Sequence, residues 1–227
     1  MTERIRTENR LDGPLDGALH LLDRQLVDVD DHLLGKVDDV ELQELPEGLT
    51  ITALLAGPAA LLGRLGGRLG PWFVDRWGRM RISEPHRTRP WRLPVELVDH
   101  LDSAVHLAVR RDGVLRRDRE GRRLGDLTGM DVYGPSGRVG RVLDARFEPG
   151  DEGLPVLSSL IVGQGRPGTL LGYDRRGDQG PWLVRVVVRR LHRHTVIVPA
   201  DRAHILWSEA RVELDHVPTD APPHAFG

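Results

Sequence analysis

The stretch LLGKVDDVEL, at 33–42, recurs as RVGRVLDARF, at 138–147, about 105 residues later. In both stretches the apolar side chains are spaced by three, three and two residues, which fits neither a regular strand nor a regular helix. A strand that bends or bulges near its glycine gives this spacing, because a bulge shifts which side chains face inward. The matching residues are Gly35 with Gly140, Lys36 with Arg141, Val37 with Val142 and Asp39 with Asp144. The repeat therefore indicates two copies of one β-module.

The match extends along both copies, so one shared strand motif does not explain it. Each copy has an apolar segment ending in glycine, a Gly-Pro-Trp tripeptide, an extended segment that enters a proline, and a four-residue turn before the bent strand. The matching ranges are 51–57 with 157–163, 70–72 with 180–182, 91–94 with 196–199, and 29–32 with 134–137. An alternating apolar strand then closes each copy. We therefore expect five or six short strands per copy.

Strands of this number and length are expected to close into a small barrel, because closure removes exposed sheet edges. The expected fold class is mainly β, with two tandem small β-barrels that carry short helical turns and pack as a pseudo-dimer. The segment RRDREGRR, 116–123, lacks an apolar face, which favours a solvated linker over a functional basic arm. The expected division is an N-terminal tail at 1–14, repeat 1 at 15–112, a charged linker at 113–123, repeat 2 at 124–216 and a C-terminal tail at 217–227.

The composition narrows the class of protein. The 227 residues are 39% apolar, enough for a sizeable core, and include 26 glycines and 16 prolines, which leave little room for long helices. Because the chain has no cysteine, it has no disulfide, thiolate nucleophile or cysteine-ligated metal. No apolar signal segment is visible at the N-terminus, and the longest apolar run, 51–62, is shorter than the roughly 20 residues of a membrane span. We expect a cytoplasmic protein without a membrane span.

The net charge of −2 hides an uneven distribution, because residues 1–57 are acidic and residues 58–127 are basic. A near-neutral total argues against a dedicated nucleic-acid coat protein, which needs a broad basic face to bind phosphates independently of sequence. Local basic patches remain compatible with this charge.

The order of these features resembles the PRC-barrel family, named for the cytoplasmic domain of the photosynthetic reaction centre H subunit. That family has a G-[KR]-V-x-D strand, and the corresponding residues here are 35–39 and 140–144. The wider context at 21–67 further resembles actinobacterial members, although the sequence departs from the family pattern at Asp31-His32, where glycine is common, and at 64–89, which is longer and more basic. Family members act in reaction-centre assembly, ribosomal small-subunit maturation and archaeal cell division. The resemblance therefore implies adaptor work, and the fold alone does not choose among such roles.

No motif predicts a catalytic or nucleotide site. The loop from Gly163 to Gly168 has the dinucleotide pattern G-x-G-x-x-G, but the glycines and proline after it exclude the helix that a pyrophosphate site requires. A hairpin loop is expected there instead. Ser136 stands in a Gly-Pro-Ser-Gly turn that is one residue short of a nucleophile elbow.

Metal-binding patterns are weak as well. His192 and His194 alternate on a predicted strand and share a face, with His204 in the same copy, but no carboxylate pair or third histidine has a persuasive spacing. His100 and His106 offer no better pattern. The acidic residues Asp28, Asp30, Asp31, Asp38 and Asp39 lack the ligand order of a calcium loop and are expected to form a solvated rim.

Aromatic and basic residues interleave over 72–92, and this cluster is the candidate for function. Trp and Arg are favoured at protein interfaces, and the same pair stacks on bases and contacts phosphates in single-stranded nucleic acid. The structural alternative is that the tryptophans close the barrel ends and the arginines coat a hairpin. The partner-binding candidates are Trp72, Trp77, Arg79, Arg81, Trp91 and Arg92, with Arg87 and Arg89 between them and Trp182, Arg185, Arg189, Arg190 and Arg193 in the second copy.

The expected function is therefore that of a non-enzymatic adaptor or scaffold that presents an Arg/Trp surface to another protein. One alternative is a protein that contacts RNA or a ribosomal protein during ribosome assembly. Another is a small-ligand or metal-binding protein. No catalytic, cofactor-binding or metal-binding residue is assigned, no cofactor is expected, and a homodimer is an open alternative for the oligomeric state.

Overall fold

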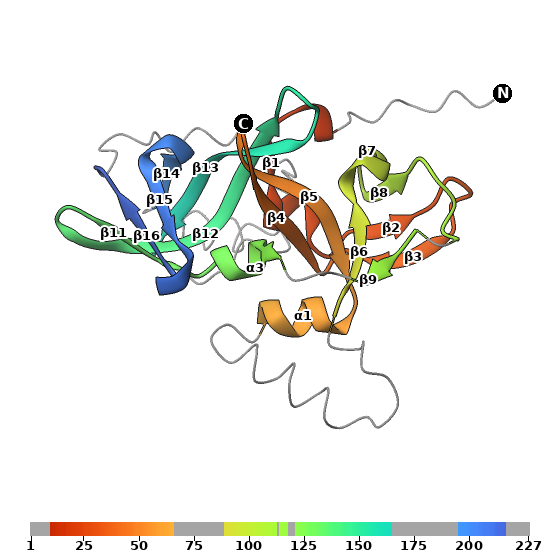
Figure 1. Cartoon of the computed structure of the whole chain (residues 1–227), viewed down its shortest axis with the longest axis horizontal. Helices are drawn as coiled ribbons and strands as arrows, with labels where there is room; N and C mark the ends of the chain where they lie inside the picture. The colour runs from red at the N-terminus through yellow and green to blue at the C-terminus, as the bar shows by residue number, and fades with distance from the viewer. Residues whose placement is uncertain (1–9, 66–88, 113, 118–120, 165–194, 217–227) are drawn as a thin grey trace, which may run out of the picture. The chain divides into compact units, whose positions relative to one another are not determined.

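The computed structural model describes residues 10–65, 89–112, 114–117, 121–164 and 195–216, and the fold is mainly β (Figure 1). The strands before residue 113 are β1 (Leu15–Asp16), β2 (Gln25–Val27), β3 (Leu33–Lys36), β4 (Asp39–Leu45), β5 (Gly48–Ala56), β6 (Trp91–Pro94), β7 (Val98–Leu101) and β8 (Ala104–Leu107). The later strands are β9 (Arg116–Arg117), β10 (Arg122–Arg123), β11 (Asp131–Gly134), β12 (Gly137–Pro149), β13 (Pro155–Gly163), β14 (Val196–Pro199), β15 (Ala203–Leu206) and β16 (Arg211–Leu214).

The helical elements of the described residues are all short. They are η1 (Arg10–Asp12), η2 (Gly17–Leu21), α1 (Pro58–Leu65), η4 (Val95–Leu97), α3 (Leu124–Leu127), η5 (Ala200–Arg202) and η6 (Trp207–Glu209). The helix α1 begins at Pro58, whose missing N–H is not needed in the first turn of a helix. The preceding Gly57 has a φ of 103°, which favours glycine, and its carbonyl accepts hydrogen bonds from the N–H groups of Ala60 and Leu61.

The chain forms two compact units. Unit 1 takes its described residues from 1–126 and 147–156, and unit 2 takes them from 127–146 and 157–227. The tip of the β12–β13 hairpin therefore belongs to unit 1, where Val156 pairs with Thr50 of β5.

Unit 1 contains two sets of paired strands. In the first set, β10, β4, β5, β6 and β9 are neighbours in that order, and each pair is antiparallel. In the second set the order is β3-β2-β8-β7, with β2 and β8 parallel. The largest fully buried side chains of this unit are Leu15, Leu26, Leu42, Ile51, Leu54, Leu55, Leu93, Leu101, Leu124 and Phe147. Nearly all are leucine or isoleucine, so aliphatic packing dominates this core.

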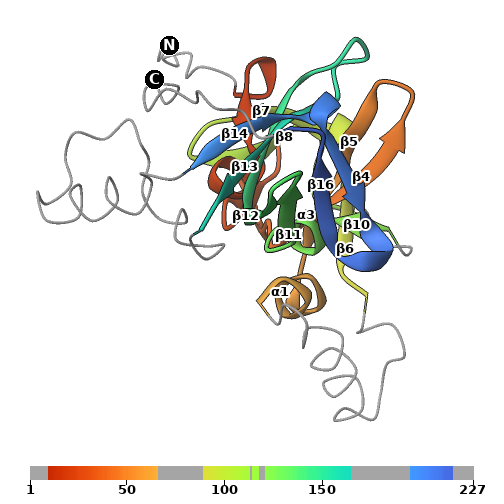
Figure 2. The same ribbon diagram turned by 90° about the vertical axis from the view of Figure 1, so that its left-hand side faces the viewer.

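Unit 2 contains β11, β14, β15 and β16 and most of β12 and β13. The strand β11 lies between β12, to which it is antiparallel, and β16, to which it is parallel (Figure 2). The strand β15 pairs antiparallel with β16, and β14 pairs antiparallel with β13. Leu143 of β12 and Ile161 of β13 pack together in the core of this unit.

The strand order and pairing of the first copy recur in the second. The first strand of each copy pairs antiparallel with the next strand and parallel with the last, and these are β2 with β3 and β8, and β11 with β12 and β16. Leu26 pairs with Gly35 in the first copy, and Val132 pairs with Gly140 in the second. The two glycines from which the repeat was inferred therefore occupy the same place in the same kind of hairpin.

The backbone around the bent strand is also repeated. In each copy one valine exchanges two hydrogen bonds with the turn that precedes the first strand, and the turn contains a residue with positive φ, Asp23 (64°) or Gly129 (89°). The bonds are Val37 N to Arg24 O (2.9 Å), Asp23 N to Val37 O (2.7 Å), Val142 N to Met130 O (3.0 Å) and Gly129 N to Val142 O (2.8 Å). These bonds replace regular ladder pairing at the bend, as expected for a bulged strand.

The segment 116–123, expected as a solvated linker, contains the short strands β9 and β10, which pair with β6 and β4, and its residues Arg116 and Arg122 are exposed. One local expectation differs from the structure. The expectation of a solvated acidic rim is wrong for Asp28 and Asp39, which are buried, and holds for the exposed Asp30 and Asp31. The two buried aspartates accept hydrogen bonds from backbone N–H groups, which compensate for the lost water.

Candidate functional site

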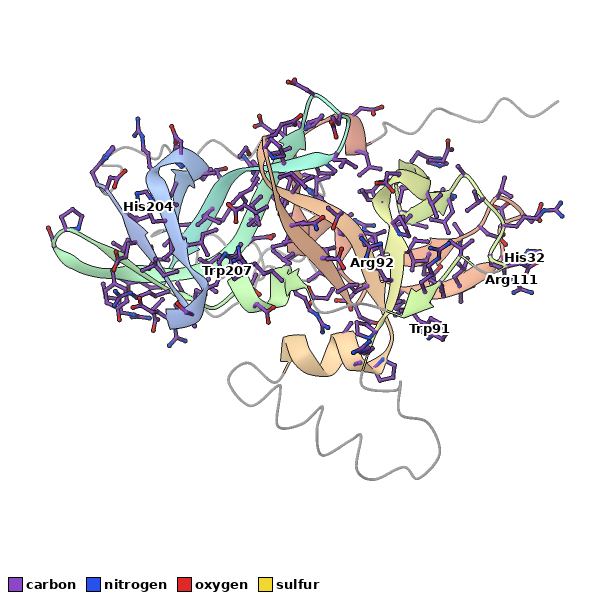
Figure 3. The ribbon with its side chains drawn as sticks, in the orientation of Figure 1. His32, Trp91, Arg92, Arg111, His204 and Trp207 are labelled. Atoms are coloured by element: carbon purple, nitrogen blue, oxygen red, sulfur yellow. The ribbon has the colours of Figure 1, made fainter. Side chains whose placement is uncertain are left out.

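The described part of the Trp/Arg cluster consists of Arg89, which precedes β6, and of Trp91 and Arg92, which lie on β6. Trp91 is 37% exposed, and its backbone pairs with Arg117 of β9. Arg116 pairs with Arg92 and is exposed, and it forms no ion pair within the described part of the chain. Figure 3 shows Trp91 at the end of β6 that lies beside β9. We call the exposed residues Arg89, Trp91 and Arg116 the β6–β9 surface.

Arg92, which follows Trp91, is tied to the interior of unit 1. Its Nε donates to both carboxylate oxygens of Glu41, at 3.0 and 2.9 Å, and its Nη2 donates to Glu41 Oε1 at 2.6 Å. The hydroxyl of Thr52 donates to the same Oε1 at 2.7 Å. Since these residues stand on β6, β4 and β5, the ion pair reaches across the central strand. Charge-assisted bonds of this geometry fix both side chains.

Several residues singled out from the sequence lie outside the described residues. These are the candidates Trp72, Trp77, Arg79 and Arg81, together with Arg87, Trp182, Arg185, Arg189, Arg190, His192, Arg193 and His194. The part of the Gly163 to Gly168 loop from residue 165 onward lies outside them as well. The structure therefore places Trp91 and Arg92 of the six partner-binding candidates.

Exposed large apolar side chains are few among the described residues. They are Val29, Leu33, Trp91 and Tyr133. Val29, Leu33 and Tyr133 belong to the first hairpin of each copy. Trp91 belongs to β6, which pairs on both sides, as the strand β11 of Tyr133 also does. An exposed tryptophan held by such a strand offers a large apolar contact with little loss of conformational freedom on binding.

Asp39 is a buried carboxyl in unit 1 with a strongly shifted pKa. Its Oδ1 accepts hydrogen bonds from the N–H groups of Val40 (2.9 Å) and Gly125 (3.0 Å). Burial raises the pKa of Asp39 to about 7, against the opposing effect of these bonds and of the Arg123 charge. The carboxyl joins the start of β4 to the helical turn α3, which indicates a structural role.

Asp28 organises the first hairpin. Its Oδ1 accepts hydrogen bonds from the N–H groups of Asp30 (3.0 Å) and His32 (2.9 Å), and its Oδ2 accepts one from Arg111 N–H (3.1 Å). Burial pushes the pKa of Asp28 upward, but these three bonds outweigh it and lower the pKa. Asp28, Asp30 and His32 have the composition of a metal site, but backbone donors use both oxygens of Asp28.

A second group with the composition of a metal site lies on the β7–β8 hairpin and was missed by the sequence patterns. His100 and His106 are Cα partners in the ladder, and Asp102 stands in the turn between the strands. The ligand atoms of the three side chains lie within 4.8 Å of one another. The signal in the sequence is the spacing H-x-D-x-x-x-H around a two-residue turn. This spacing indicates that the two histidines face each other only once the register of the two strands is known.

No family model and no curated protein matches this chain. Within the described ranges, no helix is both long and apolar enough to cross a membrane.

Proposed function

We propose that this protein is a non-enzymatic adaptor that binds another protein through the β6–β9 surface, with Trp91 as the anchor of the contact. The observation that carries the proposal is the exposed indole of Trp91 on β6, a strand whose neighbour β9 carries the exposed Arg116. Trp and Arg dominate the binding energy of many protein interfaces, because each combines a large contact area with directed donors. A partner with an apolar pocket bordered by acidic side chains fits this surface.

Arg92 supports this contact indirectly, by stabilising the strand that carries Trp91. Its guanidinium is engaged by Glu41, so we assign to Arg92 the role of holding β6 in place. Trp91 then stands on a strand fixed by paired neighbours on both sides, β5 and β9. A rigid contact surface loses less entropy on binding than a surface that must first become ordered.

The proposal includes a tandem PRC-type barrel architecture. Its support is the repeated pairing, in which the first strand of each copy lies parallel to the last, β2 with β8 and β11 with β16. Pairing of the first and last strands is what closing a strand set into a barrel requires. The segment 72–81, which supplies the candidates Trp72, Trp77, Arg79 and Arg81, precedes Trp91 in the sequence and lies outside the described residues.

The test is affinity capture from the native lysate with the full chain as bait. Tyr133 provides a matched control, because it is 38% exposed and Trp91 is 37% exposed. We expect one protein to be retained by the wild type and by Tyr133→Ala, and to be lost with Trp91→Ala. Failure to retain a specific protein, or retention of the same proteins by Trp91→Ala and by a combined Arg79→Ala, Arg81→Ala and Arg92→Ala variant, contradicts the proposal.

Ribonuclease treatment and a salt series distinguish RNA binding from protein binding. Binding of single-stranded RNA weakens with salt with a logarithmic slope of about −0.7 for each phosphate contacted. If capture is abolished by ribonuclease and follows such a slope, RNA replaces protein as the ligand of the surface. If capture survives ribonuclease, the protein contact stands.

A further inference from the structure

We propose that His100, Asp102 and His106 form a binding site for one divalent transition-metal ion of the zinc type. This proposal is independent of the adaptor function, because it rests on other residues. It assigns a ligand to a cluster that no sequence motif identified.

The hairpin sets the three side chains around one point. His100 on β7 and His106 on β8 are Cα partners in an antiparallel ladder, which places both side chains on the same face of the sheet. Asp102 comes from the turn that joins the strands, and its Oδ1 lies 3.1 Å from His106 Nε2. All three side chains are partly accessible, with exposed fractions of 31% for His100, 18% for Asp102 and 23% for His106. An ion can therefore reach the site from solvent.

The hydrogen bonds around the cluster leave metal-binding atoms available. His100 Nδ1 lies 2.8 Å from Asp99 Oδ2, so Asp99 can accept its proton and leave the Nε2 lone pair for an ion. This carboxylate–histidine arrangement is the usual outer contact of a metal-binding imidazole. The three hydrogen bonds to the Asp102 carboxylate from the described residues, donated by Ala104 N–H, Ser103 Oγ and His106, all end on Oδ1. Oδ2 is thus the available oxygen of Asp102.

The two imidazoles are stacked, with ring centroids 4.1 Å apart and an angle of 7° between the planes. A metal ion must lie near the plane of each imidazole, because the nitrogen lone pairs point outward in that plane. Sharing one ion therefore requires one ring to rotate out of the stack. Partial exposure of both side chains leaves room for this rotation, and the loss of stacking provides a signature of binding.

Two comparisons within the chain show what distinguishes this cluster. In the Asp28, Asp30 and His32 group, backbone N–H donors use both oxygens of Asp28, so binding an ion would break the hairpin turn. In the second copy the residue pair facing each other at the equivalent ladder position is His204 and Glu213. Glu213 is engaged by Arg211 at 2.7 Å, which competes with a metal ion for the carboxylate.

The donor set selects the class of ion. Two imidazole nitrogens and one carboxylate oxygen suit zinc, cobalt or nickel, whereas magnesium and calcium prefer oxygen ligands throughout. Three protein ligands leave coordination positions for water or another ligand. The site therefore resembles an open site more than a closed structural one.

The experiment uses the full chain without a histidine tag, freed of metal by a chelator. Zn²⁺ binding is measured by calorimetry, and Co²⁺ binding by its visible absorption bands. We expect one equivalent to bind, with affinity at least tenfold weaker in His106→Ala and in Asp102→Asn. Asp99→Asn is expected to weaken binding by about tenfold, as loss of an outer hydrogen-bond partner does. Circular dichroism checks that each variant is folded. If His106→Ala is not folded, His106→Gln is measured in its place.

Controls address the other histidines of the chain. His32→Ala, His204→Ala and a combined His192→Ala and His194→Ala variant are expected to bind both ions as the wild type does. The proposal is overturned if the wild type binds neither ion, if folded His106→Ala or His106→Gln binds with unchanged affinity, or if the combined His192 and His194 variant abolishes binding.

Discussion

Asp39 and Asp144 are equivalent aspartates of the two copies, and each is buried and accepts a hydrogen bond from the N–H group of the next residue. The distances are 2.9 Å from Val40 N to Asp39 Oδ1 and 2.8 Å from Ala145 N to Asp144 Oδ1. Both follow the bend of the repeated strand, where a side-chain acceptor can satisfy an N–H group that leaves the ladder. The aspartate of the repeated motif therefore has a structural role in the described fold.

The raised pKa of Asp39 predicts a pH dependence of stability. The folded state binds a proton at Asp39 up to about pH 7, whereas an unfolded aspartate releases it near pH 4. This contribution to stability is fully present below about pH 4 and is lost as the pH rises to about 7, by up to about 4 kcal/mol. Asp39→Asn keeps an oxygen for both N–H donors without a charge. Urea unfolding at pH 5 and pH 8 should show the variant losing much less stability than the wild type over this interval.

Asp131 supplies the opposite control for that measurement. Hydrogen bonds from Arg138, and then from Arg141, hold the pKa of Asp131 below its usual range. Its stabilising contribution is therefore present at neutral pH and is lost only as the pH falls through that lowered value. Asp131→Asn should leave the change between pH 5 and pH 8 as in the wild type. A wild-type change retained in Asp39→Asn would contradict the assignment.

The two equivalent glycines predict different costs for the same substitution. A Cβ on Gly140 would lie 2.6 Å from the carbonyl oxygen of Gly163, so the backbone must shift. A Cβ on Gly35 meets no atom within 4 Å, but the φ of 152° disfavours a side chain. Gly140→Ala should lower the free energy of unfolding by about 2 kcal/mol, and Gly35→Ala by about 1 kcal/mol. Urea midpoints of the two variants check this order, and the reverse order would refute the steric argument.

The Glu41–Arg92 ion pair predicts a loss of stability when one partner is removed. Arg92→Ala deletes three hydrogen bonds to a carboxylate that is largely buried. We expect a loss of about 2 kcal/mol in the free energy of unfolding, the usual range for hydrogen bonds to charged groups. A double-mutant cycle with Glu41→Gln measures the coupling of the two side chains. Additive effects of the two substitutions would show that the pair contributes nothing beyond its separate members.

The strand content and the repeat could be read from the sequence because they depend on local patterns. The spacing of apolar residues around Gly35 and Gly140, and the prolines at 94 and 199, mark strands that the structure contains. Short chain segments carry this information, since alternation and turn residues act over a few positions.

The burial of the aspartates could not be read from the sequence because their partners are remote. Asp28 accepts a hydrogen bond from Arg111, 83 residues away, and Asp39 accepts one from Gly125, 86 residues away. A run of acidic residues usually indicates solvent exposure. The histidine cluster was not predicted for a similar reason. His100 and His106 are brought opposite each other by the register of β7 and β8, which the sequence pattern does not give.

The most direct test of the adaptor proposal is site-specific photocrosslinking in the native cell. A photoreactive amino acid replaces Trp91 in one variant and Tyr133, which is equally exposed, in another. The account predicts that the residue at position 91 crosslinks to one protein partner, identified by mass spectrometry, and that the residue at position 133 does not. Absence of a protein crosslink at position 91, or the same crosslinked proteins at both positions, would contradict it.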